Sequence, residues 1–275
     1  MSSLELLSIA IIMLYVLGTV CIAVGLLARR DRLKRLSQWL TLAGFALHTV
    51  MLGLSMQGQT WQILEKAYYF RMLSWSLLLI YFFVWWRLRL EFLGLTASPV
   101  ALVFYVSSFM LADVQSKLPP AMSGLFFGLH IGTLFLSFSL MTMAFGAGLL
   151  FLYMDRKLKH KTRLSGFDRD LPALSAFDRV NHLAVMAGFP LFTLGMVSGF
   201  VWARIAWGKM LSWDPKEIVS LVVWCMFAVL FHQRLALGWR GRKTAVMAIW
   251  IFAVCVFSLL GVNFLMTTHH SFNPQ

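Results

Sequence analysis

Long apolar stretches alternate with short polar segments along the whole chain. The stretches cover, approximately, residues 6–28, 37–56, 68–86, 91–112, 122–153, 182–206, 216–235 and 244–266. Each is close to or above the length of about 20 residues that an α-helix needs to cross a bilayer. None shows the strict apolar–polar alternation that is typical of a membrane β-strand. Since only helices and closed barrels satisfy the backbone in lipid, the pattern predicts an all-α polytopic membrane protein, a bundle of eight transmembrane helices.

Basic residues mark one side of this bundle. Lys and Arg number 24 against 11 Asp and Glu, which gives a net charge of +13. Four alternate connecting segments hold 18 of the 24 basic residues: 29–35, 87–89, 156–179 and 234–243. Because loops rich in Lys and Arg lie on the cytoplasmic side, we expect both termini on the outer, periplasmic side. The charge pattern thus indicates membrane orientation rather than nucleic-acid binding.

Composition agrees with this class of protein. Residues of the AVILMFWYC set make up 60% of the chain, charged residues make up 13%, and the mean hydropathy is +0.76. These values exclude a soluble enzyme. The three cysteines lie inside apolar stretches without a Cys-x-x-Cys spacing, so we expect them to pack rather than to form a disulfide or a redox motif. No internal repeat is present, and we predict one membrane domain over 1–275.

The outer loop between the sixth and seventh predicted helices reads Trp-Gly-Lys-Met-Leu-Ser-Trp-Asp-Pro-Lys-Glu over 207–217. An aromatic belt at the membrane interface, followed by a helix N-cap at Asp214, explains part of this segment. The two indoles of Trp207 and Trp213, beside Gly208, would also suit a large planar ligand lying at the interface. Both interpretations stay open on the residues alone.

Three histidines are expected on the same outer side. His130 lies about eight residues inside the fifth predicted helix, or roughly 12 Å from its outer start at 1.5 Å per residue. His269 and His270 directly follow the eighth predicted helix. Neutral imidazole is a common axial ligand of haem iron, whereas a hydrogen-bonded histidine in a helix bundle has a purely structural role. The pattern leaves the two roles open.

Two further histidines are predicted deeper in the membrane. His48 lies near the middle of the second predicted helix, and His232 lies in the cytoplasmic half of the seventh. Ionisable residues in the membrane are costly and mark a pathway or a site, although a neutral histidine can also donate to a helix carbonyl. On the outer side, Arg204 and Lys209 are candidates for pairing with carboxylates of a ligand or for snorkelling to the interface.

From about residue 178 to the end, the chain carries an ordered string of motifs. They are Gly188-Phe189-Pro190, Thr193-Leu194-Gly195, Gly199, Trp202-Ala203, Trp207-Gly208, Trp213-Asp214-Pro215-Lys216-Glu217, Trp224, His232-Gln233-Arg234, Gly238-Trp239-Arg240-Gly241, Gly261-Val262-Asn263 and His270-Ser271-Phe272. This string resembles the CcsA/CcmC/CcmF superfamily of haem-handling membrane proteins, and most of all its CcsA branch (ResC-type) in system II cytochrome c biogenesis. The core motif region covers about 122–275.

The resemblance implies a haem b site at the outer face. The tryptophan-rich loop, with Trp207, Gly208, Trp213 and Asp214, would bind the haem, and histidines of the two outer flanks would be the axial ligands of its iron. His130 matches the first of these ligands.

His270 matches the second axial ligand better than its neighbour His269 does. His232 matches an intramembrane histidine implicated in haem passage from the cytoplasm, where an inner haem site is possible, and His48 is a candidate partner for it. The chain departs from the family pattern at Leu211, which stands where the family loop has a middle tryptophan, and at the threonine before the terminal histidines.

The function implied is that of a membrane subunit that binds, presents or translocates haem for attachment to apocytochrome c. A CcsB/ResB-like membrane subunit, apocytochrome c and haem are the expected partners. The expected location is the bacterial cytoplasmic (inner) membrane, or the thylakoid membrane for a plastid chain. Two alternatives stay open, a non-catalytic HemX-like accessory or regulatory protein and a CcmC-like haem exporter. Whether the chain contributes to a holocytochrome c synthase activity is left undecided.

Overall fold

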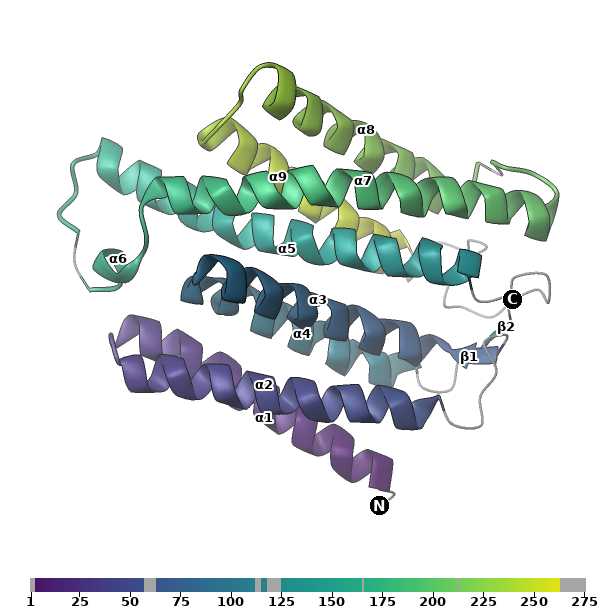
Figure 1. Ribbon diagram of the computed structural model, residues 1–275, viewed down its shortest axis with the longest axis horizontal. Coiled ribbons are helices and arrows are strands. Elements are labelled where there is room, and N and C mark those ends of the chain that lie inside the picture. Colours follow the sequence, from purple (N-terminus) through teal and green to yellow (C-terminus); the bar gives the residue numbers. More distant parts are fainter. Residues whose placement is uncertain are drawn as a thin grey trace. The chain divides into compact units, whose positions relative to one another are not determined.

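The computed structural model describes residues 3–56, 63–111, 115–117, 125–164, 166–211 and 213–262 of the chain. Its elements (Figure 1) are α1 (Ser3–Leu27), α2 (Asp31–Ser55), β1 (Ile63–Glu65), α3 (Lys66–Leu88), η1 (Glu91–Leu93), α4 (Gly94–Ser107), η2 (Ser108–Leu111), β2 (Gln115–Lys117), α5 (Leu125–Lys159), α6 (Phe167–Asp170), α7 (Leu174–Trp207), α8 (Pro215–Ala236), α9 (Arg242–Val256) and η3 (Phe257–Val262). Strands β1 and β2 pair with each other, and helices make up almost all the rest of the described chain. The all-α prediction is confirmed.

Each of the eight predicted segments contains a helix. Seven stretches of the described residues are long and apolar enough to cross a membrane: Leu4–Leu27, Ala67–Leu88, Glu91–Met110, Gly128–Lys159, Leu174–Ile205, Pro215–Ala236 and Arg242–Leu260. The protein is therefore a multi-pass membrane protein. Helix α2, which covers the second predicted segment, is long enough but is not among the seven.

Polar residues on the face that packs against α1 explain why α2 differs. The Ser37 hydroxyl donates to the Gly18 carbonyl of α1 at 2.7 Å. A Cβ added at Gly18 would lie 2.5 Å from Thr41 Oγ1, and one added at Gly44 would lie 2.7 Å from the Tyr15 ring. Small residues thus let the two backbones approach closely, as at membrane helix interfaces. These polar residues of α2 therefore contact α1 inside the protein.

The chain divides into two compact units. The first consists of residues 1–60, 64–115 and 153–173, and the second consists of 61–63, 116–152 and 174–275. In the first unit, α1 packs against α2 and α4, and α3 packs against α4 and α2. The start of α4 lies beside the end of α1, since a Cβ at Gly94 would be 3.6 Å from Ile22. The α1–α2 and α3–α4 turns, both rich in arginine, therefore share one end of this unit.

The polar linker after α5 joins the first unit at that same end. Asp170, at the end of α6, accepts hydrogen bonds from Arg29 Nε at 3.0 Å and from Lys34 Nζ at 3.1 Å. Asp168 is buried and accepts from Tyr153 Oη at 2.8 Å. The segment after α5, with its short helix α6, is thus tied to the α1–α2 turn, and we call this contact the clasp.

In the second unit, α7, α8 and α9 pack against one another, and the part of α5 up to residue 152 contacts α7 and α9. A Cβ at Gly148 would be 3.1 Å from the Ala245 carbonyl of α9, and a Cβ at Gly241 would be 3.2 Å from Phe151. Helix α7 begins at Leu174, eight residues before the predicted start. Its first turns are amphipathic, and Phe177 within them is fully buried. The helix therefore begins before the purely apolar stretch that the prediction was based on.

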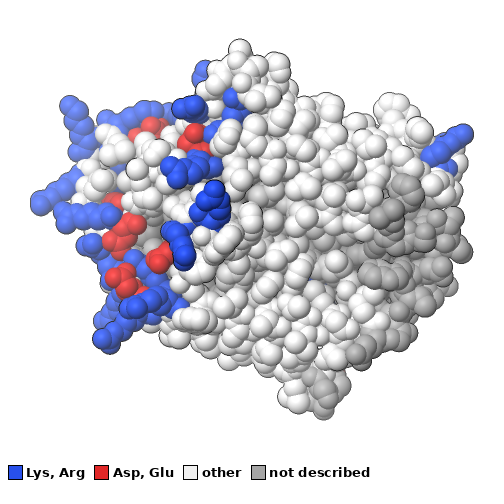
Figure 2. Space-filling view, in the orientation of Figure 1, with Lys and Arg blue, Asp and Glu red and all other residues white. Residues whose placement is uncertain are grey.

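Lys and Arg side chains gather around the segments that connect helices, and the helix sides between them are largely uncharged (Figure 2). In the first unit the α1–α2 turn, the α3–α4 turn and α6 carry them. In the second unit they follow α8 and open α9, where Arg234, Arg240, Arg242 and Lys243 lie within ten residues. This segregation is the pattern on which the predicted orientation depends.

Candidate functional site

His130 lies on α5 in the second unit, against α7. Its ring is half-buried, and Nδ1 lies 2.7 Å from the carbonyl oxygen of Gly195. A carbonyl oxygen can only accept a hydrogen bond, so Nδ1 of the neutral imidazole carries the proton and donates it. Nε2 then has the lone pair. This is the arrangement in which metal-ligating histidines are commonly held, with one ring nitrogen donating to a backbone carbonyl.

Two glycines of α7 make room for this imidazole. A Cβ added at Gly199 would lie 2.6 Å from His130 Cε1 and 2.8 Å from Nδ1, distances too short for any side chain. A Cβ at Gly195 would lie 2.6 Å from Leu134, one turn further along α5. The Trp202 ring, which is almost fully buried, lies next to the imidazole with a centroid distance of 5.7 Å. The face of α7 that carries Gly195 and Gly199, its glycine face, therefore packs against His130.

The predicted tryptophan loop begins where α7 ends. Trp207 is the last residue of α7, and its side chain lies outside the described residues. Gly208 has φ +73°, a left-handed conformation that glycine adopts without strain. The Gly208 amide donates to the Arg204 carbonyl at 3.0 Å, and the Arg204 guanidinium donates to the Gly208 carbonyl. Arg204 thus holds the start of the loop, while Lys209 is exposed.

The loop ends at Trp213 and Asp214. Trp213 is 72% exposed and has φ +59°, an unusual conformation for a residue with a side chain. Asp214 is buried, and its carboxylate accepts from the backbone N–H of Lys216 at 2.9 Å. Pro215 follows as the first residue of α8. The predicted N-cap is confirmed, and the Trp213 side chain directly before it is exposed.

The start of α8 lies near His130. Lys216, in the first turn of α8, is close enough for its charge to act on the imidazole. The structure therefore brings His130, the glycine face of α7 and the capped end of the loop to one end of the second unit. His269 and His270 lie outside the described residues, which end at Val262.

The two inner candidates lie in different units. His232 is exposed on α8 of the second unit. His48, on α2 of the first unit, is completely buried. Its Nδ1 is 3.0 Å from the Tyr15 hydroxyl, the Tyr105 ring lies 4.8 Å away between centroids, and Nε2 has no hydrogen-bond partner among the described residues. Neither histidine meets another predicted site residue within the described part of its own unit.

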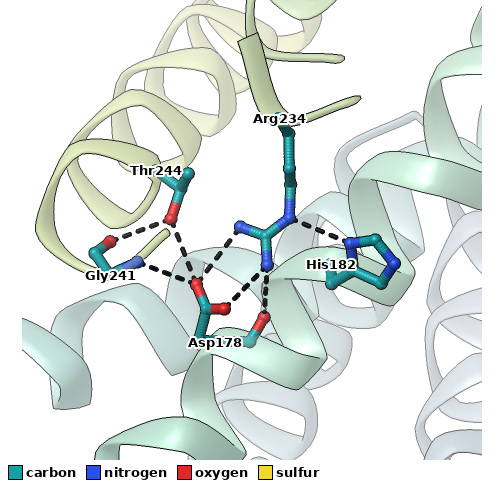
Figure 3. A network of polar contacts seen from close by, with 5 residues as sticks. All are labelled: Asp178, His182, Arg234, Gly241 and Thr244. Carbon is teal, nitrogen blue, oxygen red and sulfur yellow. Dashed lines mark hydrogen bonds and ion pairs between the residues drawn. The ribbon is translucent and has the colours of Figure 1, made fainter. Parts of the chain in front are cut away.

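A polar network at the opposite end of the second unit was not expected from the sequence (Figure 3). Asp178 and His182 are one turn apart on α7, and both accept hydrogen bonds from Arg234 of α8. Asp178 also accepts from the backbone N–H of Gly241 at 2.9 Å and contacts the Thr244 hydroxyl at 3.4 Å. The spacing of four residues between Asp178 and His182, which puts them on one face of a helix, was the signal available in the sequence.

Comparisons with known proteins place the chain in a family. Residues 61–270 match the family model described as Cytochrome C assembly protein. The chain belongs to this family. The match includes His130, the tryptophan loop, His232 and both terminal histidines, so it spans every predicted site residue except His48.

Curated relatives agree with the family model. The chain is 31% identical over 230 residues to the cytochrome c biogenesis protein CcsA of Trieres chinensis, covering 73% of this chain and 74% of the relative. It is 31% identical over 219 residues to the CcsA protein of Guillardia theta, with coverages of 73% and 72%. The CcsA protein of Prochlorococcus marinus (strain MIT 9312) is 32% identical over 198 residues, 64% of each chain. The resemblance seen in the sequence motifs is confirmed.

Proposed function

We propose that this family member acts in cytochrome c biogenesis by binding haem b at the outer face of the membrane and presenting it to apocytochrome c. The observation that carries the proposal is the tautomer of His130. Its Nδ1–H is held by the Gly195 carbonyl at 2.7 Å, which directs the Nε2 lone pair away from that bond. Among the described histidines, His130 is the one that both has this Nδ1–H tautomer and lies near the tryptophan loop.

The surroundings of His130 fit a tetrapyrrole ligand. Gly199 leaves no side chain between α7 and the imidazole, and Trp202 supplies an aromatic surface beside it. The Trp213 indole is held outward by a strained backbone and a capped helix start, as expected for a flat surface that contacts a ligand rather than the core. His130 would be one axial ligand of the iron, and His270, or His269 beside it, would be the other.

The protein's part in the chemistry is to hold and orient the cargo. Iron protoporphyrin carries the vinyl groups to which the cysteine thiols of an apocytochrome become attached. His130 and His270 would keep the iron ligated, the Trp207–Trp213 loop would support the ring, and Arg204 would keep that loop closed onto the end of α7. A CcsB/ResB-like membrane subunit is the proposed partner in presenting the haem to the apocytochrome.

We further propose eight membrane crossings in a single membrane domain, with α2 as the eighth and both termini outside. Helix α2 is as long as α1, and its polar residues pack against α1. The membrane would be the bacterial cytoplasmic membrane, or the thylakoid membrane for a plastid chain. His232 would lie on the haem path from the cytoplasm, where an inner haem site could form. His48 as its partner remains a proposal from the sequence alone.

The absorption spectrum of the protein purified in detergent tests the outer site. We expect the Soret and α bands of a bis-histidine b-type haem, and we expect His130→Ala combined with His270→Ala to remove them. His160→Ala, at an exposed histidine on the cytoplasmic side, is the matched control and should leave the spectrum intact. Added imidazole should restore the bands in His130→Gly. An unchanged spectrum in the double variant would reject the outer assignment.

The role in biogenesis needs a second measurement. Co-expression with a CcsB-like subunit and a reporter apocytochrome should give covalently attached haem, and His130→Ala should reduce its yield. Haem binding with no covalent product in any pairing would instead favour the accessory or exporter roles.

A further inference from the structure

Arg234 joins two residues of α7 at the end of the second unit that is opposite to His130. Its Nη1 and Nη2 donate to the two oxygens of the Asp178 carboxylate at 3.2 and 2.9 Å, and Nη2 also donates to the Asp178 carbonyl at 2.9 Å. Its Nε donates to His182 Nδ1 at 3.1 Å. The Arg234 side chain is 4% exposed. All three guanidinium nitrogens are therefore engaged within the protein.

This contact fixes the tautomer of His182. An arginine nitrogen is always a donor, so His182 Nδ1 must accept, and the proton of the neutral imidazole must reside on Nε2. Figure 3 shows Nδ1 facing Arg234 and the second ring nitrogen facing away from the network. His182 is an exposed residue. It therefore presents an N–H donor, the opposite of the lone pair that His130 presents.

The charge around His182 is positive. Among the described residues of the second unit, Asp178 is the acidic side chain at this end, where the basic side chains are Arg179, Arg234, Arg240, Arg242 and Lys243. The Asp178 carboxylate forms a bidentate contact with Arg234, so its negative charge is already compensated. Arg240 is exposed and directly precedes Gly241, whose backbone N–H donates to Asp178, one turn from His182 on α7. An oxyanion near His182 would thus meet an N–H donor and a cation that has no acidic partner among the described residues.

We propose that His182 Nε2 and Arg240 form an oxyanion site at this end of the second unit. On the function proposed above, the oxyanion is a propionate carboxylate of haem arriving from the cytoplasm. A haem that presents its propionates to this site keeps its iron for other histidines, since a protonated Nε2 cannot ligate a metal. Arg234 is a positioning residue here, because it holds His182 in the donating state. The phosphate of an anionic phospholipid shares the same chemistry, and the test separates the two sources.

The test uses the full-length protein in inverted membrane vesicles, which expose the cytoplasmic face. Haem or its dimethyl ester is added, and the rate at which the His130-dependent Soret band appears is followed. Wild type should load haem about tenfold faster than the ester, the factor expected for one charge-assisted hydrogen bond. His182→Phe and Arg240→Gln should slow haem to the rate of the ester and leave the ester rate unchanged.

Three controls make the result specific. Lys243→Gln removes a neighbouring exposed charge and should load haem like wild type. His182→Gln retains an amide N–H donor and a carbonyl that can accept from Arg234, so it should restore most of the rate. In nanodiscs of neutral lipid, with or without phosphatidylglycerol, the difference between haem and ester should persist in wild type.

Equal rates for haem and ester in wild type, or a slower rate in Lys243→Gln than in Arg240→Gln, would overturn the proposal. It would also be overturned if His182→Phe slowed the ester as much as haem, or if the haem preference appeared only with phosphatidylglycerol, which would assign the site to lipid. Failure of the proposed function looks different, because wild type would then develop no His130-dependent Soret band with either compound.

Discussion

The two units use a histidine in opposite ways. In the first unit, His48 is sealed between the side chains of Tyr15 and Tyr105 and has no exposed surface. In the second unit, His130 is half-buried and bonds to a backbone carbonyl of α7. Both residues interrupt apolar helices in the sequence, and hydropathy alone does not distinguish them. The comparison indicates that partners, rather than depth in the helix, distinguish a fully enclosed imidazole from a half-buried one.

The surrounding residues follow the same division. Around His48 the neighbours are large hydroxylated aromatics, and Tyr105 also donates to Met51 at 2.9 Å. Around His130 the neighbours on α7 are glycines, with Trp202 to one side. Large side chains enclose His48, whereas the glycines of α7 let the His130 ring pack directly against the backbone of that helix. The first unit therefore encloses its histidine completely, and the second leaves its histidine half-buried.

The largest effect should come from the inner network of the second unit. Arg234→Leu leaves the Asp178 carboxylate without its buried partner, and removal of one member of a buried ion pair typically costs about 3–5 kcal/mol. We expect a loss of this size in the free energy of unfolding, measured in detergent. Asp178→Leu combined with Arg234→Leu should recover much of it. Arg242→Gln, at an exposed position, is the control. A loss below about 1 kcal/mol in Arg234→Leu would contradict the network's structural role.

His48→Leu sharpens the contrast between the two histidines. The substitution removes the bond to Tyr15 and alters a fully packed site, so we expect a stability loss of about 1–3 kcal/mol. The His130-dependent Soret band per folded protein should remain that of wild type. Thermal unfolding in detergent and the Soret absorbance measure the two effects on the same sample. Tyr15→Phe, which removes only the hydroxyl, should lose less stability. If His48→Leu removed the His130-dependent band with unchanged stability, His48 would act at the outer site and the contrast would fail.

Gly199→Ala tests the opposite side of the comparison. The added methyl would lie 2.6 Å from His130 Cε1, so the ring must move away from the Gly195 carbonyl. Loss of such a supporting bond typically lowers metal affinity about 10- to 100-fold, while we expect stability to fall by about 1 kcal/mol. Haem titration monitored by absorbance provides the measurement. Gly132→Ala, whose added Cβ meets no described atom within 4 Å, should bind haem like wild type. Equal haem affinities in the two variants would show that Gly199 has no role in haem binding.

Sequence reasoning recovered what local patterns encode. Apolar runs located the helices, and the Asp214–Pro215 pair located an N-cap that the structure confirms. It did not distinguish α2, because the partners of Ser37 and Thr41 lie on another helix. Nor did it identify Gly199 as the contact of His130, since 69 residues separate them and helix periodicity gives no register between α5 and α7. Contacts between helices depend on packing, which a single sequence does not express.

The Asp178–Arg234 pair shows the same limit in the clearest form. In the sequence, Asp178 and Arg234 belong to two separate basic segments, 156–179 and 234–243, and charge patterning does not pair them. The hydrogen bond between Arg234 and His182 joins positions 52 residues apart. It converts a boundary histidine into one with a fixed tautomer, a property that only the partner determines.

The smallest effect should come from the clasp between α6 and the α1–α2 turn in the first unit. Hydrogen bonds from Lys34, and then from Arg29, hold the pKa of Asp170 below its ordinary value. A lowered pKa in the folded state means that Asp170 stabilises the protein above its unfolded-state pKa of about 3.9. This contribution is lost as the pH falls through the lower folded value. At neutral pH, Asp170→Asn should lose less than about 1 kcal/mol, because Arg29 is half-exposed and Lys34 retains its ion pair with Asp31.

The measurement for Asp170 is thermal stability in detergent at neutral pH and at progressively lower pH. The difference between wild type and Asp170→Asn should shrink with acidification and also with added salt, which screens the exposed Arg29 contact. Asp155→Asn is a matched control, since it breaks the Lys159 pair within a single helix of the same unit. A difference for Asp170→Asn that grows as the pH falls would reverse the sign of this contribution. The clasp would then not stabilise the unit in which His48 is enclosed.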